Sequence, residues 1–142
     1  MNGGKIVELI ISEIDLFVID KVRELRGKSI PYVSQVELSQ RMGYADGYVG
    51  KVENFSSNAR YNIRKLNLIS NALKLDTPQE LLPNKTIVND LIFLKLEINS
   101  KKNDKVEFDK EGNVIKNYKI IEMKILNEDQ IKSHNSRIKK KS

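Results

Sequence analysis

Residues 34–54 read SQVELSQRMGYADGYVGKVEN, and this stretch decides the fold predicted for the chain. Ser34 and Glu37 match the Ser-x-x-Glu capping box that begins a helix, and Gly43 follows as a helix stop. A second short helix is expected over residues 45–53. The stretch therefore predicts two short helices joined by a tight turn.

Further helices are expected on both sides. Apolar residues at helical spacing predict one helix over residues 12–26, ended by Gly27, and another over residues 62–74, followed by a last short turn. Residues 91–98 alternate apolar and polar side chains, which is typical of a half-buried strand. Two more strands, over 105–108 and 114–125 with a turn at 109–113, would complete a small β-meander. The predicted fold is mainly α, with an N-terminal extension (1–11), a five-helix domain (12–83), a β-rich extension (84–130) and a basic disordered tail (131–142).

The composition narrows the classes of function. The 142-residue chain has no Cys, which excludes disulfides, a thiolate nucleophile and a Cys-ligated zinc site. The single His, His134, lies in a polar stretch, and no metal-binding or phosphate-binding motif is present. We therefore expect no catalytic residues, no metal and no cofactor. The apolar stretch within residues 6–19 is too short and too charged to span a bilayer, so we expect a cytoplasmic protein without a membrane partner.

The distribution of charge bears on the partner. A net charge of +6 suggests an anionic partner. Residues 1–83 carry 11 Lys/Arg and 10 Asp/Glu, a net charge of +1, whereas residues 84–142 carry 14 and 9, a net charge of +5. Because the excess lies in the C-terminal part, the bulk charge alone does not identify a DNA-binding face.

The two short helices meet the requirements of a helix-turn-helix. Gly43 permits the tight turn, Ser39 is a small residue where the helices would cross, and Val49 is a buried aliphatic residue of the second helix. In this motif the second helix enters the major groove of DNA and the first lies across the backbone.

Residues 18–83 resemble the Cro/lambda-repressor-like family of helix-turn-helix proteins, also called the xenobiotic response element family. The combination of VGKVEN, ARYN and ELLP looks most like a Bacteroidetes-type variant. The resemblance implies a five-helix lambda-repressor-like domain, and an internal pair between Glu53 and Arg26. The matching segments are VRELR at 22–26, SQVELSQRMGY at 34–44, YVGKVEN at 48–54 and LISNALKL at 68–75.

The resemblance also implies which residues face the bases. Asp46, Gly47, Tyr48 and Lys51 occupy the base-facing positions. Lys51 can donate to guanine O6 and N7, and Asp46 could accept from cytosine N4 or only cap the helix. Tyr48 could donate to a phosphate or stack on a sugar. Gly47 and Gly50 are consistent with close approach to DNA, with a helix that orders only on DNA, or with a crowded crossing against the preceding helix.

Four residues are expected at the phosphates. Gln35 corresponds to a family position that holds the DNA backbone, at a helix N-terminus with partial positive charge. Asn54, Asn58 and Arg60 lie where the following loop would meet the next phosphates. Arg60 could equally be an ordinary solvated charge.

These patterns predict a sequence-specific double-stranded DNA-binding protein, a repressor-like transcriptional regulator whose recognition helix covers about 45–53. The alternative is a protein-interaction module, such as the antitoxin of a toxin–antitoxin pair, that autoregulates through the helix-turn-helix. It would bind a protein partner through residues 84–126.

A homodimer is also expected, because one recognition helix reads only a few base pairs. The expected contact buries the alternating apolar side chains of residues 91–98 against a second copy, namely Ile92, Leu94, Leu96 and Ile98. One competing arrangement packs this sheet on the helices of the same chain. The other uses the N-terminal apolar residues Ile6, Leu9 and Ile10 as the dimer surface.

Overall fold

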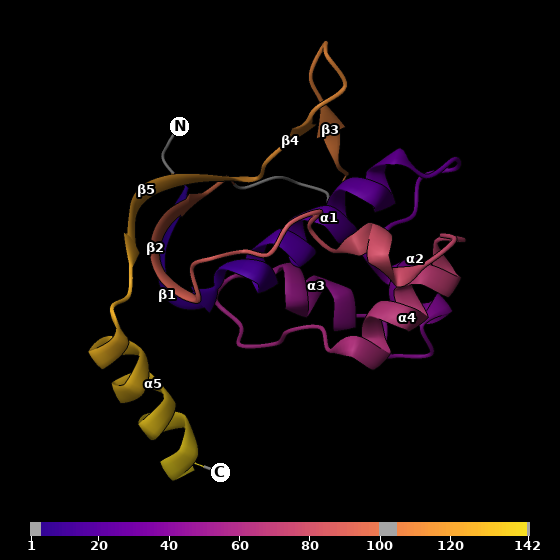
Figure 1. Cartoon of the computed structure of the whole chain (residues 1–142). Helices are drawn as coiled ribbons and strands as arrows, with labels where there is room; N and C mark the ends of the chain where they lie inside the picture. Colours follow the sequence, from indigo (N-terminus) through magenta and orange to yellow (C-terminus); the bar gives the residue numbers. More distant parts are fainter. Residues whose placement is uncertain (1–3, 100–104, 142) are drawn as a thin grey trace.

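The fold combines helices with a three-stranded sheet, and a strand precedes the helices (Figure 1). The computed structural model describes residues 4–99 and 105–141, without the side chains of residues 138–141. The predicted mainly α layout, with β structure only after the helices, is therefore wrong. In chain order the elements are β1 (Lys5–Ser12), α1 (Glu13–Lys28), α2 (Gln35–Arg41), α3 (Tyr48–Glu53), α4 (Ile63–Ala72), η1 (Pro78–Leu81), β2 (Leu91–Ile98), β3 (Glu107–Phe108), β4 (Val114–Ile115), β5 (Tyr118–Ile125) and α5 (Glu128–Lys141).

Side-chain caps begin α1, α2 and η1, and Ser34 is the cap that the sequence predicts for α2. The hydroxyls of Ser12 and Ser34 each accept a hydrogen bond of 3.0 Å from the backbone N–H three residues ahead, which satisfies a donor that the helix leaves unpaired. Thr77 forms a capping box with Glu80 at the start of η1. The predicted helix positions are thus confirmed here, apart from shifts of a few residues at their ends.

Strand β1 replaces the expected N-terminal extension of residues 1–11. It pairs antiparallel with β2 along all eight of its residues. Val7 and Ile11 are buried and Glu8 is exposed, which is the alternation of a strand with one covered face. β1 could not be predicted from local sequence, because the residues of β2 that pair with it lie 79 to 93 positions further along the chain and no turn links the two strands locally.

The sheet has the strand order β1-β2-β5, with the predicted strand of residues 91–98 at its centre. Ile92, Leu94 and Leu96 are almost completely buried, in one core cluster with Val22 of α1 and Leu38 of α2. The expected burial of this face by a second copy is therefore wrong. With β1 added, the sheet is wide enough to pack on the helices of its own chain, as the first competing arrangement proposes.

A small hairpin stands apart from this sheet. β3 pairs with β4, while β5 returns to pair with β2, so the expected meander is wrong. The turn at 109–113 is confirmed: the Asp109 carboxylate accepts hydrogen bonds of 2.9 Å from the N–H groups of Glu111 and Asn113. Gly112 has φ +85°, a conformation that glycine adopts without strain.

Gly27 has a role other than the one the sequence suggests. Helix α1 continues through it to Lys28, so the expected helix end at Gly27 is wrong. A Cβ at this position would lie 2.8 Å from the Cβ of Val106. The absence of a side chain therefore lets the segment that leads into β3 approach α1. The Arg23 guanidinium of α1 holds the other strand of this hairpin, β4, by donating 3.0 Å to the backbone oxygen of Ile115.

The expected disordered tail of residues 131–142 is wrong over the part that the structure describes, because residues up to 141 belong to α5. Asn127 and Gln130 begin this helix by exchanging hydrogen bonds between side chain and backbone, of 2.9 and 2.8 Å. The helix projects from the end of β5 (Figure 1). Among the described helices, none has the length and apolar character needed to cross a membrane.

Candidate nucleic-acid interface

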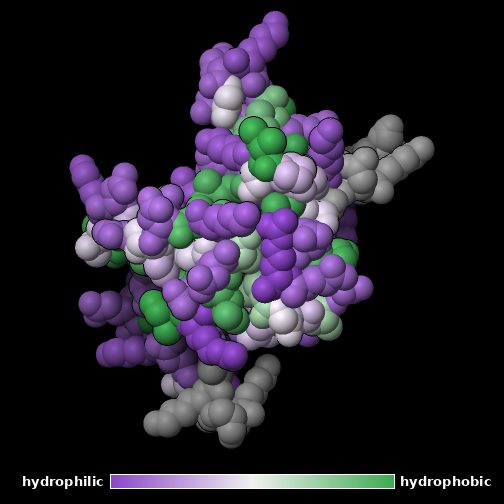
Figure 2. Space-filling view, turned by 90° about the vertical axis from the view of Figure 1, so that its right-hand side faces the viewer, coloured by the Kyte–Doolittle hydropathy of each residue, from purple (hydrophilic) through white to green (hydrophobic). Residues whose placement is uncertain are grey.

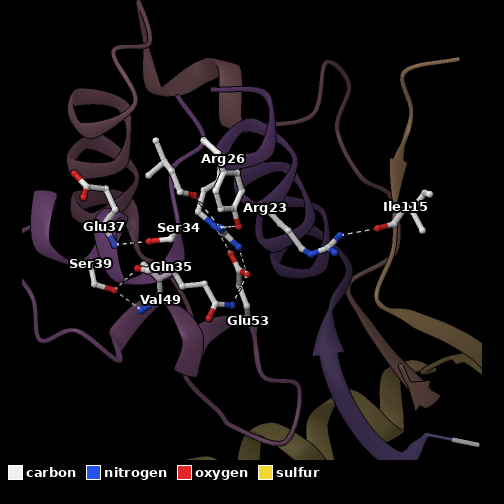
Figure 3. Close-up of polar contacts among 11 residues, drawn as sticks. Arg23, Arg26, Ser34, Gln35, Glu37, Ser39, Val49, Glu53 and Ile115 are labelled. Atoms are coloured by element: carbon white, nitrogen blue, oxygen red, sulfur yellow. Dashed lines mark hydrogen bonds and ion pairs between the residues drawn. The ribbon is translucent and has the colours of Figure 1, made fainter. Parts of the chain in front are cut away.

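The Ser39 side chain links α2 to α3. Its hydroxyl donates 2.8 Å to the backbone oxygen of Gln35 and accepts 2.9 Å from the backbone N–H of Val49 (Figure 3). Leu38 and Val49 are completely buried beside it, and Gly43 has φ +81° in the connecting turn. One small polar side chain thus joins the first helix of the pair to the N-terminal turn of the second.

A buried ion pair anchors the other end of α3 to α1. Arg26 donates to the two carboxylate oxygens of Glu53, 2.7 Å from Nη2 and 3.1 Å from Nε, and the side chains are 0% and 5% exposed. Nη1 of Arg26 donates to the hydroxyl of Tyr32 and to the backbone oxygen of Val33. Burial alone would lower the pKa of Arg26, but the charge of Glu53 raises it above its ordinary value. The Arg26–Glu53 pair that the resemblance implies is confirmed.

Gln35 belongs to this internal network. Its amide donates 2.9 Å to Oε1 of Glu53, and Figure 3 shows the side chain turned toward that carboxylate. A Cβ at Gly50 would lie 3.0 Å from Oε1 of Gln35. The geometry favours a crowded crossing as the reason for Gly50. The Gln35 amide therefore orients Glu53, and its phosphate contact stays a prediction.

The exposed side of α3 and of the turn before it presents three of the four predicted base-facing residues. Asp46, Gly47 and Lys51 are exposed. Gly47 occupies the N-cap position, so Asp46 does not cap the helix; instead its carboxylate accepts 3.1 Å from the amide of Gln40. A Cβ at Gly47 would meet no heavy atom within 4 Å. Within the described chain, Lys51 makes no hydrogen bond or ion pair, which leaves its ammonium available.

Tyr48 is not placed for readout in this conformation. Its ring stacks on Tyr44 with 4.4 Å between centroids and meets the edge of Tyr61 at 6.3 Å. Lys65 lies over the Tyr48 ring, with Nζ 5.1 Å from the centroid. The Tyr48 hydroxyl is buried without a hydrogen-bond partner among the described atoms. The ring therefore packs α3 against α4, and a phosphate contact would require the side chain to turn outward.

The loop after α3 carries the remaining residues predicted to contact phosphates, and these residues differ in exposure. Asn54 is exposed, and its Oδ1 accepts 2.9 Å from the N–H of Ser56. Asn58 is also exposed. Arg60 is half-buried and donates to the backbone oxygens of Ser57 and Ala59, at 3.1 and 2.7 Å. Burial lowers the pKa of Arg60, and the charge of Asp15 opposes that shift.

Helix α5 adds polar groups that the sequence analysis did not place. His134 and Arg137 share the lining of a cavity of about 540 Å³ with Asn58 and Arg60. The signal that could have revealed α5 is the Asn-x-x-Gln spacing of residues 127 and 130, which resembles a capping box. This juxtaposition brings part of the C-terminal basic segment beside the loop that follows α3.

The surface around α2 and α4 is mostly hydrophilic. Figure 2 shows the face that lies on the right of Figure 1, and its hydrophobic residues form small separate groups. Among the described side chains, no group of three or more His, Cys, Asp or Glu is placed to hold a metal ion. The site therefore offers hydrogen bonding and charge from α3 and its flanking turns.

Comparison with protein-family models found no match, and comparisons with curated proteins and with solved structures found none either. The resemblance of residues 18–83 to the lambda-repressor-like family stays a prediction based on the sequence motifs.

Proposed function

We propose that this protein binds double-stranded DNA sequence-specifically through α3, as a transcriptional regulator of the repressor type. The observation that carries the proposal is the fixed pair α2–α3. Ser39 sets one end of α3 and the Arg26–Glu53 pair sets the other, while Asp46 and Lys51 are left exposed. A short helix held at both ends, with exposed polar groups on it and on the turn before it, suits insertion into the major groove.

The roles of the exposed residues follow from their chemistry. Lys51 would donate to the O6 and N7 acceptors of guanine. Asp46, which already accepts from Gln40, would accept from cytosine N4. The open space around Gly47 would admit the DNA backbone or a base edge. Asn54 would contact a phosphate from the C-terminal end of α3.

The charge of the helical part limits the affinity of one copy. Residues 1–83 have 11 Lys/Arg and 10 Asp/Glu, a net charge of +1. Among these cations, Arg26 is buried in its ion pair with Glu53 and cannot contact a phosphate. Nonspecific affinity grows with the number of phosphates that cations neutralise. We therefore propose that the protein acts as a homodimer, with two recognition helices on two half-sites about one helical turn apart.

Selection from random duplex DNA with the full chain tests the proposal. We expect an enriched sequence, and we expect Lys51→Ala to relax the preference at one base-pair position. Lys85→Ala is the matched control, because Lys85 is exposed in the segment before β2, away from α3 in the sequence. The absence of any enriched sequence, or equal enrichment by wild type and Lys51→Ala, would contradict the proposal.

A further inference from the structure

Strand β5 carries a row of apolar side chains that its own chain leaves half-exposed. Ile120, Ile121, Met123 and Ile125 are 45%, 46%, 52% and 54% exposed. Scattered apolar residues are ordinary on a protein surface, but Ile120, Met123 and Ile125 lie opposite three β2 residues of one face, and Ile121 is the extra residue of a β-bulge between them. This β5 patch is the most concentrated group of exposed large apolar side chains in the described chain.

The patch is exposed because the helices cover only part of the sheet. Met123 and Ile125 lie opposite Leu94 and Ile92 of β2, so they share the face that packs on the helices. The β2 residues are buried, whereas their β5 neighbours are not. β5 also pairs with no described strand except β2, so its other edge has free backbone donors and acceptors. An edge of this kind is a template for another strand.

The opposite face of the sheet carries a row of alternating charges that stops at this edge. Glu8 of β1 lies opposite Lys95 of β2, and Lys95 lies opposite Glu122 of β5. Directly opposite residues of antiparallel strands interact, favourably for opposite charges and unfavourably for like charges. Glu122 also pairs with Lys124 of its own strand, with 3.0 Å between Oε2 and Nζ, and a basic residue on a strand added to β5 would extend the row from Glu122.

We propose that β5 pairs antiparallel with β5 of a second copy, about a two-fold axis through Met123. In this register Glu122 of each copy lies opposite Lys124 of the other, so the charge row continues into the second chain. Ile121 lies opposite Ile125 of the second copy. Registers centred on Glu122 or on Lys124 would instead bring two like charges together at the axis.

The other edge strand does not offer the same contact. Val7 and Ile11 of β1 are already buried by the helices of the same chain, and Ile6, 49% exposed, is the single large apolar residue of β1 that is mainly exposed. A strand added to β1 would therefore gain backbone hydrogen bonds but little apolar burial. β5 offers both. Its charges also complement those of a second β5, so we place the contact between the β5 strands of two copies.

The biological role of this dimer rests on the proposed DNA binding, because the dimer would place two α3 helices on one duplex. Three strands from each chain would form one six-stranded sheet. A two-fold axis through Met123 would relate the two α2–α3 pairs. Symmetric half-sites in DNA require such an axis.

Charge variants of the full chain test the register. Lys124→Glu puts a carboxylate opposite Glu122 of the second copy, and Glu122→Lys puts an ammonium opposite Lys124. By light scattering at tens of micromolar, we expect wild type to have the molar mass of two chains. Each variant alone should have half that mass, the mass of one chain. An equimolar mixture of the variants restores both opposite-charge pairs, so we expect it to return to the mass of two.

Glu8→Lys is the matched control. Glu8 and Glu122 both lie opposite Lys95, so both substitutions disturb the same charge within the sheet, but only Glu122 lies on β5. Glu8→Lys should keep the mass of two chains. A wild type with the mass of one chain would overturn the proposal, as would variants that stay dimeric.

A cross-link gives a second measurement. The chain has no Cys, so a single introduced thiol has no competing partner within its own chain. Met123→Cys should form a disulfide-linked dimer on mild oxidation, because the two copies of residue 123 lie opposite each other at the axis. Lys85→Cys should form much less. Equal cross-linking of the two variants would contradict the register.

The two proposals fail separately. A monomeric protein that still selects a DNA sequence would overturn only the β5 pairing. A dimer that cross-links at residue 123 and selects no DNA sequence would overturn only the DNA-binding function.

Discussion

Two residues of α3, only two positions apart, show how differently the fold treats charge. Glu53 lies in the interior junction of α1, α2 and α3, where Arg26 and Gln35 donate to its carboxylate. Lys51 lies on the outer surface of the same helix, exposed and without an ion pair among the described residues. A charge on a short helix therefore indicates function only after its partners within the fold have been accounted for.

The interior junction should depend strongly on its ion pair. Glu53→Ala leaves the Arg26 guanidinium buried and uncompensated, and breaking a buried pair in this way costs about 3–5 kcal/mol. Urea unfolding of the full chain measures the loss. Glu37→Ala removes the exposed pair with Arg41 instead, and we expect it to cost less than about 1 kcal/mol. Similar losses in the two variants would show that Glu53 does not anchor α3.

Two glycines should separate stability from DNA binding. Gly27→Ala forces a Cβ to within 2.8 Å of Val106, and overpacking of this kind costs about 1–3 kcal/mol. It should leave DNA binding unchanged once the protein is folded. Gly47→Ala has open space around its Cβ, so it should lower the free energy of unfolding by at most about 1 kcal/mol, because Ala is a poorer N-cap than Gly, and it should weaken DNA binding. Urea unfolding measures the stability of each variant, and fluorescence anisotropy on a selected duplex measures its DNA binding. Weaker DNA binding by Gly27→Ala, with unchanged binding by Gly47→Ala, would place the interface near β3.

Ser39 offers a smaller change at the junction. Ser39→Ala removes the acceptor of the Val49 N–H, which should cost about 1 kcal/mol of stability. Ser70→Ala is the control, because the buried Ser70 hydroxyl donates only to the backbone oxygen of Leu66 within its own helix. Thermal unfolding compares the two variants. A larger loss for Ser70→Ala would mean that the Ser39 link does not stabilise the α2–α3 pair.

The sequence predicted those parts of the fold whose signals are local. Ser34 and Gly43 mark the limits of α2 within a few residues, and the structure confirms both. The Arg26–Glu53 pair was predicted from the family resemblance. Local sequence patterns could not predict it, because the two residues lie on different helices, α1 and α3. These features depend on neighbours that are close in the chain or fixed by the motif.

The features that the sequence did not predict depend on distant contacts. β1 is defined by its pairing with β2, and the role of Gly27 is defined by Val106. Tyr48 occupies a position expected to face outward, yet Tyr44 and Tyr61 hold its ring against the helices. A position on a helical wheel gives no information about such partners.

Whether α3 reads DNA is tested by measuring the affinities of wild type and Lys51→Ala for the selected duplex and for a scrambled duplex of equal length, at one salt concentration. If α3 reads the major groove, Lys51→Ala should lose about 1–3 kcal/mol on the selected duplex, or roughly 5- to 150-fold in Kd, and much less on the scrambled one. Its free energy of unfolding should match that of wild type. Equal affinities of the two proteins for the selected duplex would contradict the assignment of α3 as the recognition helix.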